Sequence, residues 1–274
     1  MRTEIVVHEI ATGAERVVHA ADAHLEAPNW APDGALLVNG GGRLWRLAPG
    51  AAALAVVDTG PLTRLNNDHG LSPDGAWLAV SDRTPGGGSA IHVLPATGGT
   101  PRRVTAREPS YWHGWSPDGA RLAYVANRGA GFQVHDIAVE GGAERALTEG
   151  FDHCDGPDYT PDGAWIWFNG ERDGAVDLWR IPAEGGTPER MTAGPSVDWF
   201  PHPSPDGAHV LYLAYPPGTR GHPADLSVEL RLMPATGGDS RRLTGLRGGQ
   251  GTINVPSWAP DGAAFAYCRY PAPD

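Results

Sequence analysis

The apolar residues of this chain come in short runs that are separated by glycine, proline and aspartate, and the runs recur in a fixed order. The tripeptide Pro-Asp-Gly marks this order and occurs at residues 32–34, 73–75, 117–119, 161–163, 205–207 and 260–262. Its aspartates are 41, 44, 44, 44 and 55 residues apart. Proline sets φ at the first corner of a tight turn, while Asp-Gly supplies a side-chain acceptor and a positive φ. Each copy therefore predicts a tight turn between two strands.

The same succession of strands follows each turn. A second strand is predicted over 77–80, 122–125, 165–168 and 210–213, and a third over 90–94, 132–137 and 177–181. A Gly-Gly turn at 98–99, 141–142, 185–186 or 237–238 then leads to a fourth strand that contains Arg and Thr. A helical period is not sustained in any segment. A four-stranded unit repeated at this period predicts an all-β, six-bladed β-propeller of four-stranded blades.

The two ends of the chain fit a closed ring. The sixth Pro-Asp-Gly is followed by a single strand, over 264–269, whereas two strands, over 4–10 and 15–19, precede the first copy. We expect the N-terminal strands to pair with the C-terminal blade, because closure removes the exposed sheet edges of a linear array. Residues 1–274 are then one propeller domain.

The charge and the apolar runs of the chain argue against nucleic acid and membranes as partners. The net charge of −11 argues against nucleic acid, which needs a basic surface. The chain lacks an apolar run long enough to cross a membrane, and Met1–Ile5 lacks a signal-peptide core, so we expect a cytoplasmic monomer without a membrane partner. A periplasmic location would follow if a leader had been removed. Two free thiols, Cys154 and Cys268, agree with a reducing compartment.

The segment Trp-Ser-Pro-Asp-Gly at 115–119, together with the succession of strands above, resembles the TolB-type β-propeller repeat, also called the WD40-like or PD40 repeat. The resemblance covers essentially the whole chain. It implies six blades around a central channel, with a functional face where the loops that enter the innermost strands gather. Proteins with this repeat include binding proteins, peptidase lids and enzymes, so the function has to be argued from individual residues.

One position of the repeat departs from its own pattern. The residue five places before the turn aspartate is commonly proline in the TolB-type repeat. Four copies keep it, at Pro28, Pro157, Pro201 and Pro256, whereas His69 and His113 replace it in two adjacent blades. We interpret this exchange as the centre of a site.

The segments just before the turns carry amides, carboxylates and aromatic rings, which suit a saccharide or another polyhydroxylated ligand. We expect them to be loops at the channel mouth, joined there by His222 from an insertion over 215–227. The predicted ligand-binding residues are Asn67, Asp68, His69, Tyr111, Trp112, His113, Asp155, Trp199, His202, His222, Gln250 and Asn254.

Four of the histidines suggest a second chemistry. His69, His113, His153 and His202, with carboxylates nearby, could hold a divalent metal ion such as zinc or manganese, or act as general acid and base. The pattern thus supports two functions. One is a TolB-like binding protein for a small polar or saccharide-like ligand or a segment of a partner protein. The alternative is a metal-dependent lyase or hydrolase that acts on a carbohydrate, similar in residue type to the oligogalacturonate lyases.

Two further features are predicted to be structural. The aromatic residues before the turns, such as Trp115 and Trp258, should pack between blades. Arginines recur near the ends of the second strands, at Arg83, Arg128 and Arg172, and we expect internal ion pairs for them.

Overall fold

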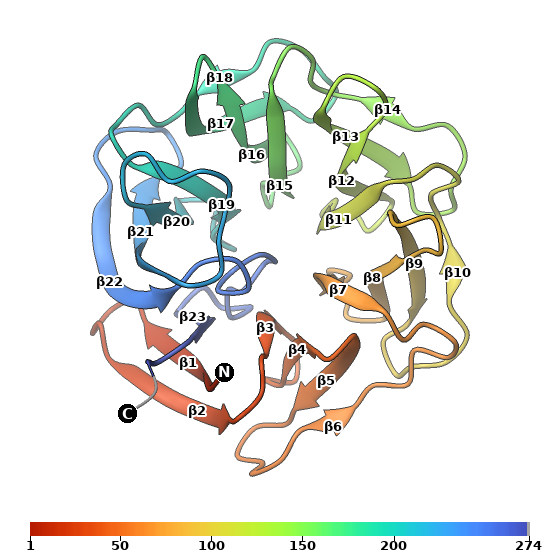
Figure 1. The fold of residues 1–274 in the computed structure, drawn as a ribbon, viewed down its shortest axis with the longest axis vertical. Helices are drawn as coiled ribbons and strands as arrows, with labels where there is room; N and C mark the ends of the chain where they lie inside the picture. The colour runs from red at the N-terminus through yellow and green to blue at the C-terminus, as the bar shows by residue number, and fades with distance from the viewer. Residues whose placement is uncertain (273–274) are drawn as a thin grey trace.

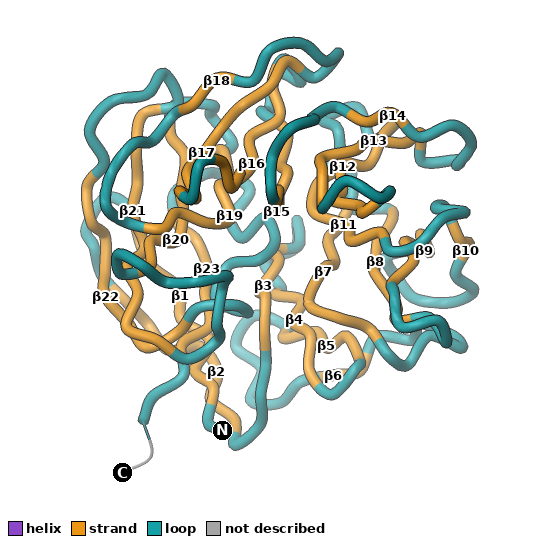
Figure 2. Tube along the Cα trace, turned by 45° about the horizontal axis from the view of Figure 1, so that its top comes forward, coloured by secondary structure: helices purple, strands orange, loops and turns teal. Residues whose placement is uncertain are grey.

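Six blades of β-strands are arranged around a central axis in the computed structural model, which describes residues 1–272 (Figure 1). Within this range the secondary structure consists only of strands, turns and loops, as the tilted view in Figure 2 also shows. The described residues accordingly include no helix that could cross a membrane. The predicted all-β, six-bladed propeller is confirmed.

Five blades consist of four consecutive strands each. The strands of blades one to three are β3 (Glu26–Trp30), β4 (Leu36–Gly40), β5 (Arg43–Leu47) and β6 (Ala55–Val56); β7 (Leu65–Leu71), β8 (Trp77–Arg83), β9 (Ser89–Pro95) and β10 (Arg102–Arg103); and β11 (Ser110–Trp115), β12 (Arg121–Asn127), β13 (Phe132–Ala138) and β14 (Arg145–Ala146). Those of blades four and five are β15 (His153–Tyr159), β16 (Trp165–Arg172), β17 (Ala175–Pro182) and β18 (Glu189–Arg190); and β19 (Val197–Pro203), β20 (His209–Tyr215), β21 (Leu226–Pro234) and β22 (Arg241–Gly248).

The sixth blade joins the two ends of the chain, as predicted. Strand β1 (Thr3–Glu9) lies between β2 (Glu15–Ala21) and the last strand, β23 (Ala264–Arg269). Arg269 pairs with Glu4 across this junction, and their side chains form an ion pair of 2.8 Å. On the other side of β23, Trp258 makes one β-bridge to Phe265 in place of a full innermost strand.

The Pro-Asp-Gly turns have the predicted geometry. In the third blade, Oδ1 of Asp118 accepts hydrogen bonds from the Ala120 N–H (3.0 Å) and the Ser116 hydroxyl (2.6 Å). Gly119 has φ +70°, which only glycine adopts without strain. The turn therefore fixes the register of the two strands that it joins.

Tryptophans connect neighbouring blades. The Trp115 indole donates a hydrogen bond to the Gly70 carbonyl (3.0 Å), and Trp258 donates one to the His202 carbonyl (3.0 Å), which confirms the predicted packing role. The Trp112 ring packs directly against the same glycine, since a Cβ at Gly70 would lie 2.1 Å from that ring. At these two junctions a buried tryptophan therefore joins a blade to the preceding one.

The segments before the turns differ from the prediction. In blades one to five they are the innermost strands themselves, not loops. A β-bulge interrupts each of these strands, for example between Asp155 and Asp158 and between Trp199 and His202. An extra residue in the bulge re-aims the side chains while the flanking ladder continues. Polar residues at the channel therefore occupy strand positions.

Candidate functional site at the channel mouth

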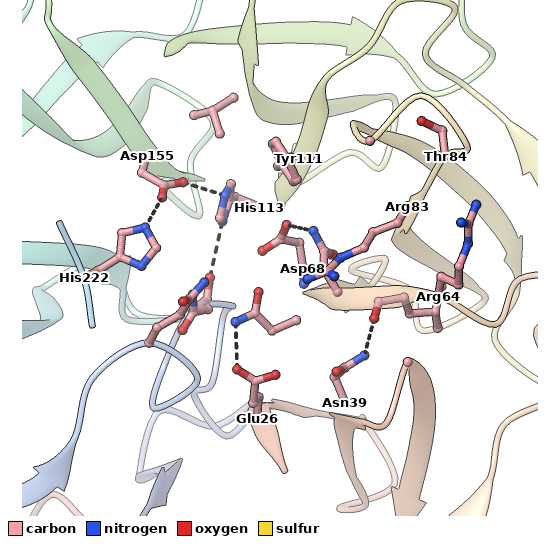
Figure 3. Close-up of a pocket in the computed structure, with 18 of the residues that line it drawn as sticks. Glu26, Asn39, Arg64, Asp68, Arg83, Thr84, Tyr111, His113, Asp155 and His222 are labelled. Carbon is pink, nitrogen blue, oxygen red and sulfur yellow. Dashed lines mark hydrogen bonds and ion pairs between the residues drawn. The ribbon is translucent and has the colours of Figure 1, made fainter. Parts of the chain in front are cut away.

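A cavity of about 1270 Å³ lies where the innermost strands begin, at the centre of the ring (Figure 3). The innermost strands of blades one to four contribute to its wall, as do the insertion in blade five and the segment before Trp258. Eight of the predicted ligand-binding residues, together with His153, line it: Asn67, Asp68, Tyr111, His113, Asp155, His222, Gln250 and Asn254. The structure thus brings together side chains from five different blades.

The other four predicted residues lie outside the cavity lining. Trp112 packs between blades, as described above. Trp199 is buried beneath the wall, where its ring meets His222 edge-on with 4.4 Å between centroids. It positions the histidine.

The last two of these four residues, His69 and His202, are buried between the blades. His202 lies between the Asp158 carboxylate (3.0 Å) and the Ile253 carbonyl (2.6 Å), and so it links blades. His69 is buried, and neither of its ring nitrogens makes a hydrogen bond of good geometry. Burial lowers the pKa of His69 to about 4, despite the nearby backbone of Leu37 and Asn67. The side chain of His69 is therefore uncharged at neutral pH.

His113 and Asp155 form an ion pair in the wall. Nε2 of His113 lies 2.8 Å from Oδ1 of Asp155, and Nδ1 faces the Asn254 carbonyl at 3.3 Å. Burial alone would lower the pKa of His113, but the Asp155 and Asp68 carboxylates outweigh it and raise that pKa to about 9. The same contact holds the pKa of Asp155 well below its usual value in spite of burial. Both groups are charged at neutral pH.

Two more imidazoles approach the second oxygen of Asp155. Nε2 of His222 lies 3.6 Å from Oδ2, and Nε2 of His153 lies 4.0 Å away, both beyond hydrogen-bond distance. Burial would lower the pKa of His153, but Asp155 raises it above the ordinary value; burial prevails at His222, whose pKa is lowered. Asp155 thus pairs with His113 and lies near His153 and His222, and these four residues are called the Asp155 cluster below.

The four histidines suggested as metal ligands do not converge. His69 and His202 lie apart from the Asp155 cluster, and the Asp155 carboxylate is already engaged by His113. Within residues 1–272, no three or more His, Cys, Asp or Glu side chains are placed to hold a metal ion. The four histidines therefore do not form a binding site for one metal ion, and the functions proposed below involve no metal.

Two carboxyl groups on another part of the wall retain protons more strongly than usual. Burial raises the pKa of Asp68 to about 7, although the nearby His113 and the Asn66 amide, which donates a 2.7 Å hydrogen bond, lower it. Burial likewise raises the pKa of Glu26, which accepts a hydrogen bond from Asn67 (3.3 Å). A carboxyl group with the pKa of Asp68 can exchange protons near neutral pH.

Sequence reasoning missed two arginines in the wall, Arg64 and Arg83. Arg128 makes the expected internal ion pair, with Glu144 at 2.8 Å, whereas Arg172 lies over the Phe151 ring at 4.1 Å. Arg83 makes no ion pair within the described part of the chain, contrary to the prediction. The sequence placed Arg83 at the end of a second strand, but it did not show that this end lies opposite Arg64.

The fold and the wall define a six-bladed β-propeller with a large polar cavity at one end of its channel. Within that class, the chain belongs to the TolB β-propeller family, because the PD40 family model matches residues 1–155 and 113–272.

Relatives agree with this assignment. An uncharacterised protein of Agrobacterium fabrum is 48% identical over 272 residues, which cover 98% of this chain and 93% of the relative. A solved structure from Agrobacterium tumefaciens, provisionally named TolB, is also 48% identical, with a TM-score of 0.96 and 99% of both chains covered.

More distant structures share the fold alone. TolB from Acinetobacter baumannii has a TM-score of 0.62 at 19% identity, and the alignment covers 88% of this chain and 65% of that one. An oligogalacturonate lyase in complex with manganese has a TM-score of 0.59 at 15% identity, with 96% and 77% covered. At these identities the resemblance defines the architecture and carries no argument about the site.

Proposed function

We propose that this protein is a TolB-like binding propeller that takes a small polar ligand of saccharide size into the cavity at its channel mouth. The observation that carries the proposal is the cavity itself, with a volume of about 1270 Å³ and a wall of amides, carboxyls, imidazoles and guanidinium groups. This volume exceeds that of most small-molecule sites, so a ligand would bind together with water.

Several wall groups remain available to a ligand. The side-chain amide of Gln250 makes no hydrogen bond to another described residue. Tyr111 and Phe132 place two tilted rings beside one another, 5.8 Å apart, and such rings can pack against a sugar face. A segment of a partner protein is the alternative occupant, but the lining offers titratable and amide groups rather than apolar pockets for anchoring side chains.

One observation favours a second candidate, an enzyme acting on the same ligand. Asp68, with a pKa of about 7, and His113, with a pKa of about 9, line one cavity. A carboxyl group whose pKa lies near neutral pH suits a general base. Asp68 would accept a proton from the ligand, and the buried imidazolium of His113, whose nitrogens face Asp155 and Asn254, would stabilise the negative charge that develops.

The test is a library of neutral, anionic and cationic sugars and polyols, screened by thermal shift and followed by calorimetry. Ligands of the parent protein should bind Tyr111→Ala and Gln250→Ala about tenfold more weakly, since each removes one contact of roughly 1.4 kcal/mol. His209→Ala, on the exposed start of β20, is the control and should bind as the parent does. The proposal fails if the library contains no ligand, or if both cavity variants retain full affinity.

The same ligands separate binding from catalysis. Each is incubated with the parent and with Asp68→Asn, and products are sought by mass spectrometry. An unchanged ligand supports the binding protein, whereas turnover that is lost in Asp68→Asn supports the enzyme.

A further inference from the structure

Arg64 and Arg83, here called the arginine pair, face each other across two strands of blade two. Arg64 immediately precedes β7, and Arg83 is the last residue of β8. The Arg83 N–H donates to the Arg64 carbonyl (3.0 Å), next to the Leu65–Asp82 pair of the ladder. Directly opposed residues of an antiparallel pair project to one face, and Figure 3 shows both side chains at the cavity.

The arginine pair lacks an internal counterion. Like charges at directly opposed positions repel each other. Neither guanidinium makes an ion pair or a hydrogen bond to another side chain among residues 1–272. The adjacent Asp82 uses its carboxylate to accept the Arg64 backbone N–H (2.9 Å). Both side chains are exposed to solvent at the cavity, so they are open to an external anion.

The acidic groups of the wall make no ion pair with the arginine pair. Asp155 is matched by His113 at 2.8 Å. Asp68 and Glu26 accept hydrogen bonds from side-chain amides. Burial raises the pKa of Asp68 to about 7, which reduces its negative charge near neutral pH. Burial also raises the pKa of Glu26, although the Arg83 guanidinium is near enough to lower it in part. Figure 3 shows the arginine pair on the side of the cavity away from Asp155 and His222. That side is therefore the positive end of the site.

We propose that the ligand carries an anionic oxygen group, a carboxylate or a phosphate, which Arg64 and Arg83 bind together at the blade-two end of the cavity. This inference rests on the proposed function and names the class of ligand. Two guanidinium groups offer planar, always charged donors that match the oxygens of either anion. The uncharged part of the ligand then extends towards Tyr111 and the Asp155 cluster.

The experiment uses inorganic phosphate and malonate as probes, each compared with chloride at equal ionic strength. Thermal shift and calorimetry are applied to the parent, Arg64→Gln, Arg83→Gln and a matched control, Arg241→Gln. Arg241 is an exposed arginine on the outer strand β22, outside the cavity lining and without an ion pair among the described residues. The parent and the control should be stabilised by at least one probe, with about tenfold weaker binding in both cavity variants. The stronger probe distinguishes a phosphate from a carboxylate.

A second readout needs no ligand. In chloride at low ionic strength, Arg64→Gln and Arg83→Gln should melt at or above the temperature of the parent, because either change removes the repulsion. The inference is overturned if the parent and both cavity variants respond equally to the probes. It is also overturned if the library yields only neutral or cationic ligands, a result that leaves the proposed function intact.

Discussion

At the scale of single residues, the ion pair between His113 and Asp155 makes stability depend on pH. The folded protein raises the pKa of His113 from 6.5 to about 9, so the imidazolium is favoured by folding. Its contribution is fully present below pH 6.5 and is lost as the pH rises through about 9. We expect His113→Gln to lower the free energy of unfolding by about 3 kcal/mol at pH 6, because Asp155 is left buried without its partner. Urea denaturation measures the change.

The difference between parent and variant should shrink at pH 10, where the imidazole of the parent is neutral. His209→Gln serves as the control, because His209 is exposed, and should show little effect at either pH. An equal difference at pH 6 and pH 10 would mean that His113 carries no charge in the folded protein.

The sequence predicted some residues of the site and missed others, depending on whether each one departs from the repeat pattern. His113 departs from the proline of four other blades, and this departure identified a residue that lines the cavity. The arginine pair could not be found in the same way. Its members are 19 positions apart and meet only because a bulge between Leu65 and His69 shifts the ladder, and no residue type announces that bulge. Trp199 and His202 pointed to the wrong segment, because β19 contributes no residue to the cavity lining.

At the scale of the element, the contact between β7 and β11 depends on the absence of a side chain at Gly70. A Cβ there would lie 2.1 Å from the Trp112 ring, which is fully buried and cannot retreat. We expect Gly70→Ala to lower the free energy of unfolding by about 3 kcal/mol through overpacking. Trp112→Phe should restore part of this loss, because the indole of Trp112 makes no hydrogen bond that phenylalanine would remove. A double-mutant cycle by urea denaturation measures the coupling, and strictly additive effects would contradict the contact.

At the scale of the whole molecule, the repeat made the architecture predictable. The Pro-Asp-Gly turn sets the register of each hairpin. The single strand after the last turn and the two strands before the first turn predicted that both ends of the chain share one blade, as the structure shows. The backbone conformation of segments outside the repeat could not be predicted from it. The chain from Gly249 to Trp258 replaces an innermost strand with irregular backbone, yet it supplies Gln250 and Asn254 to the cavity wall.

Closure predicts that the ring depends on the first residues of the chain. Deleting residues 1–20 removes β1 from the middle of blade six and exposes both the edge of β23 and the core around Ile5 and Val6. We expect the truncated protein to show no cooperative thermal transition, because several buried apolar side chains of roughly 1.5–3 kcal/mol each are lost together. A circular permutant that begins at Asp22 and carries residues 1–21 after the C-terminus through a short linker keeps every strand. It should melt within a few degrees of the parent, since both ends of the chain lie at blade six (Figure 1). A truncated protein that melts like the parent would show that the sixth blade does not need β1.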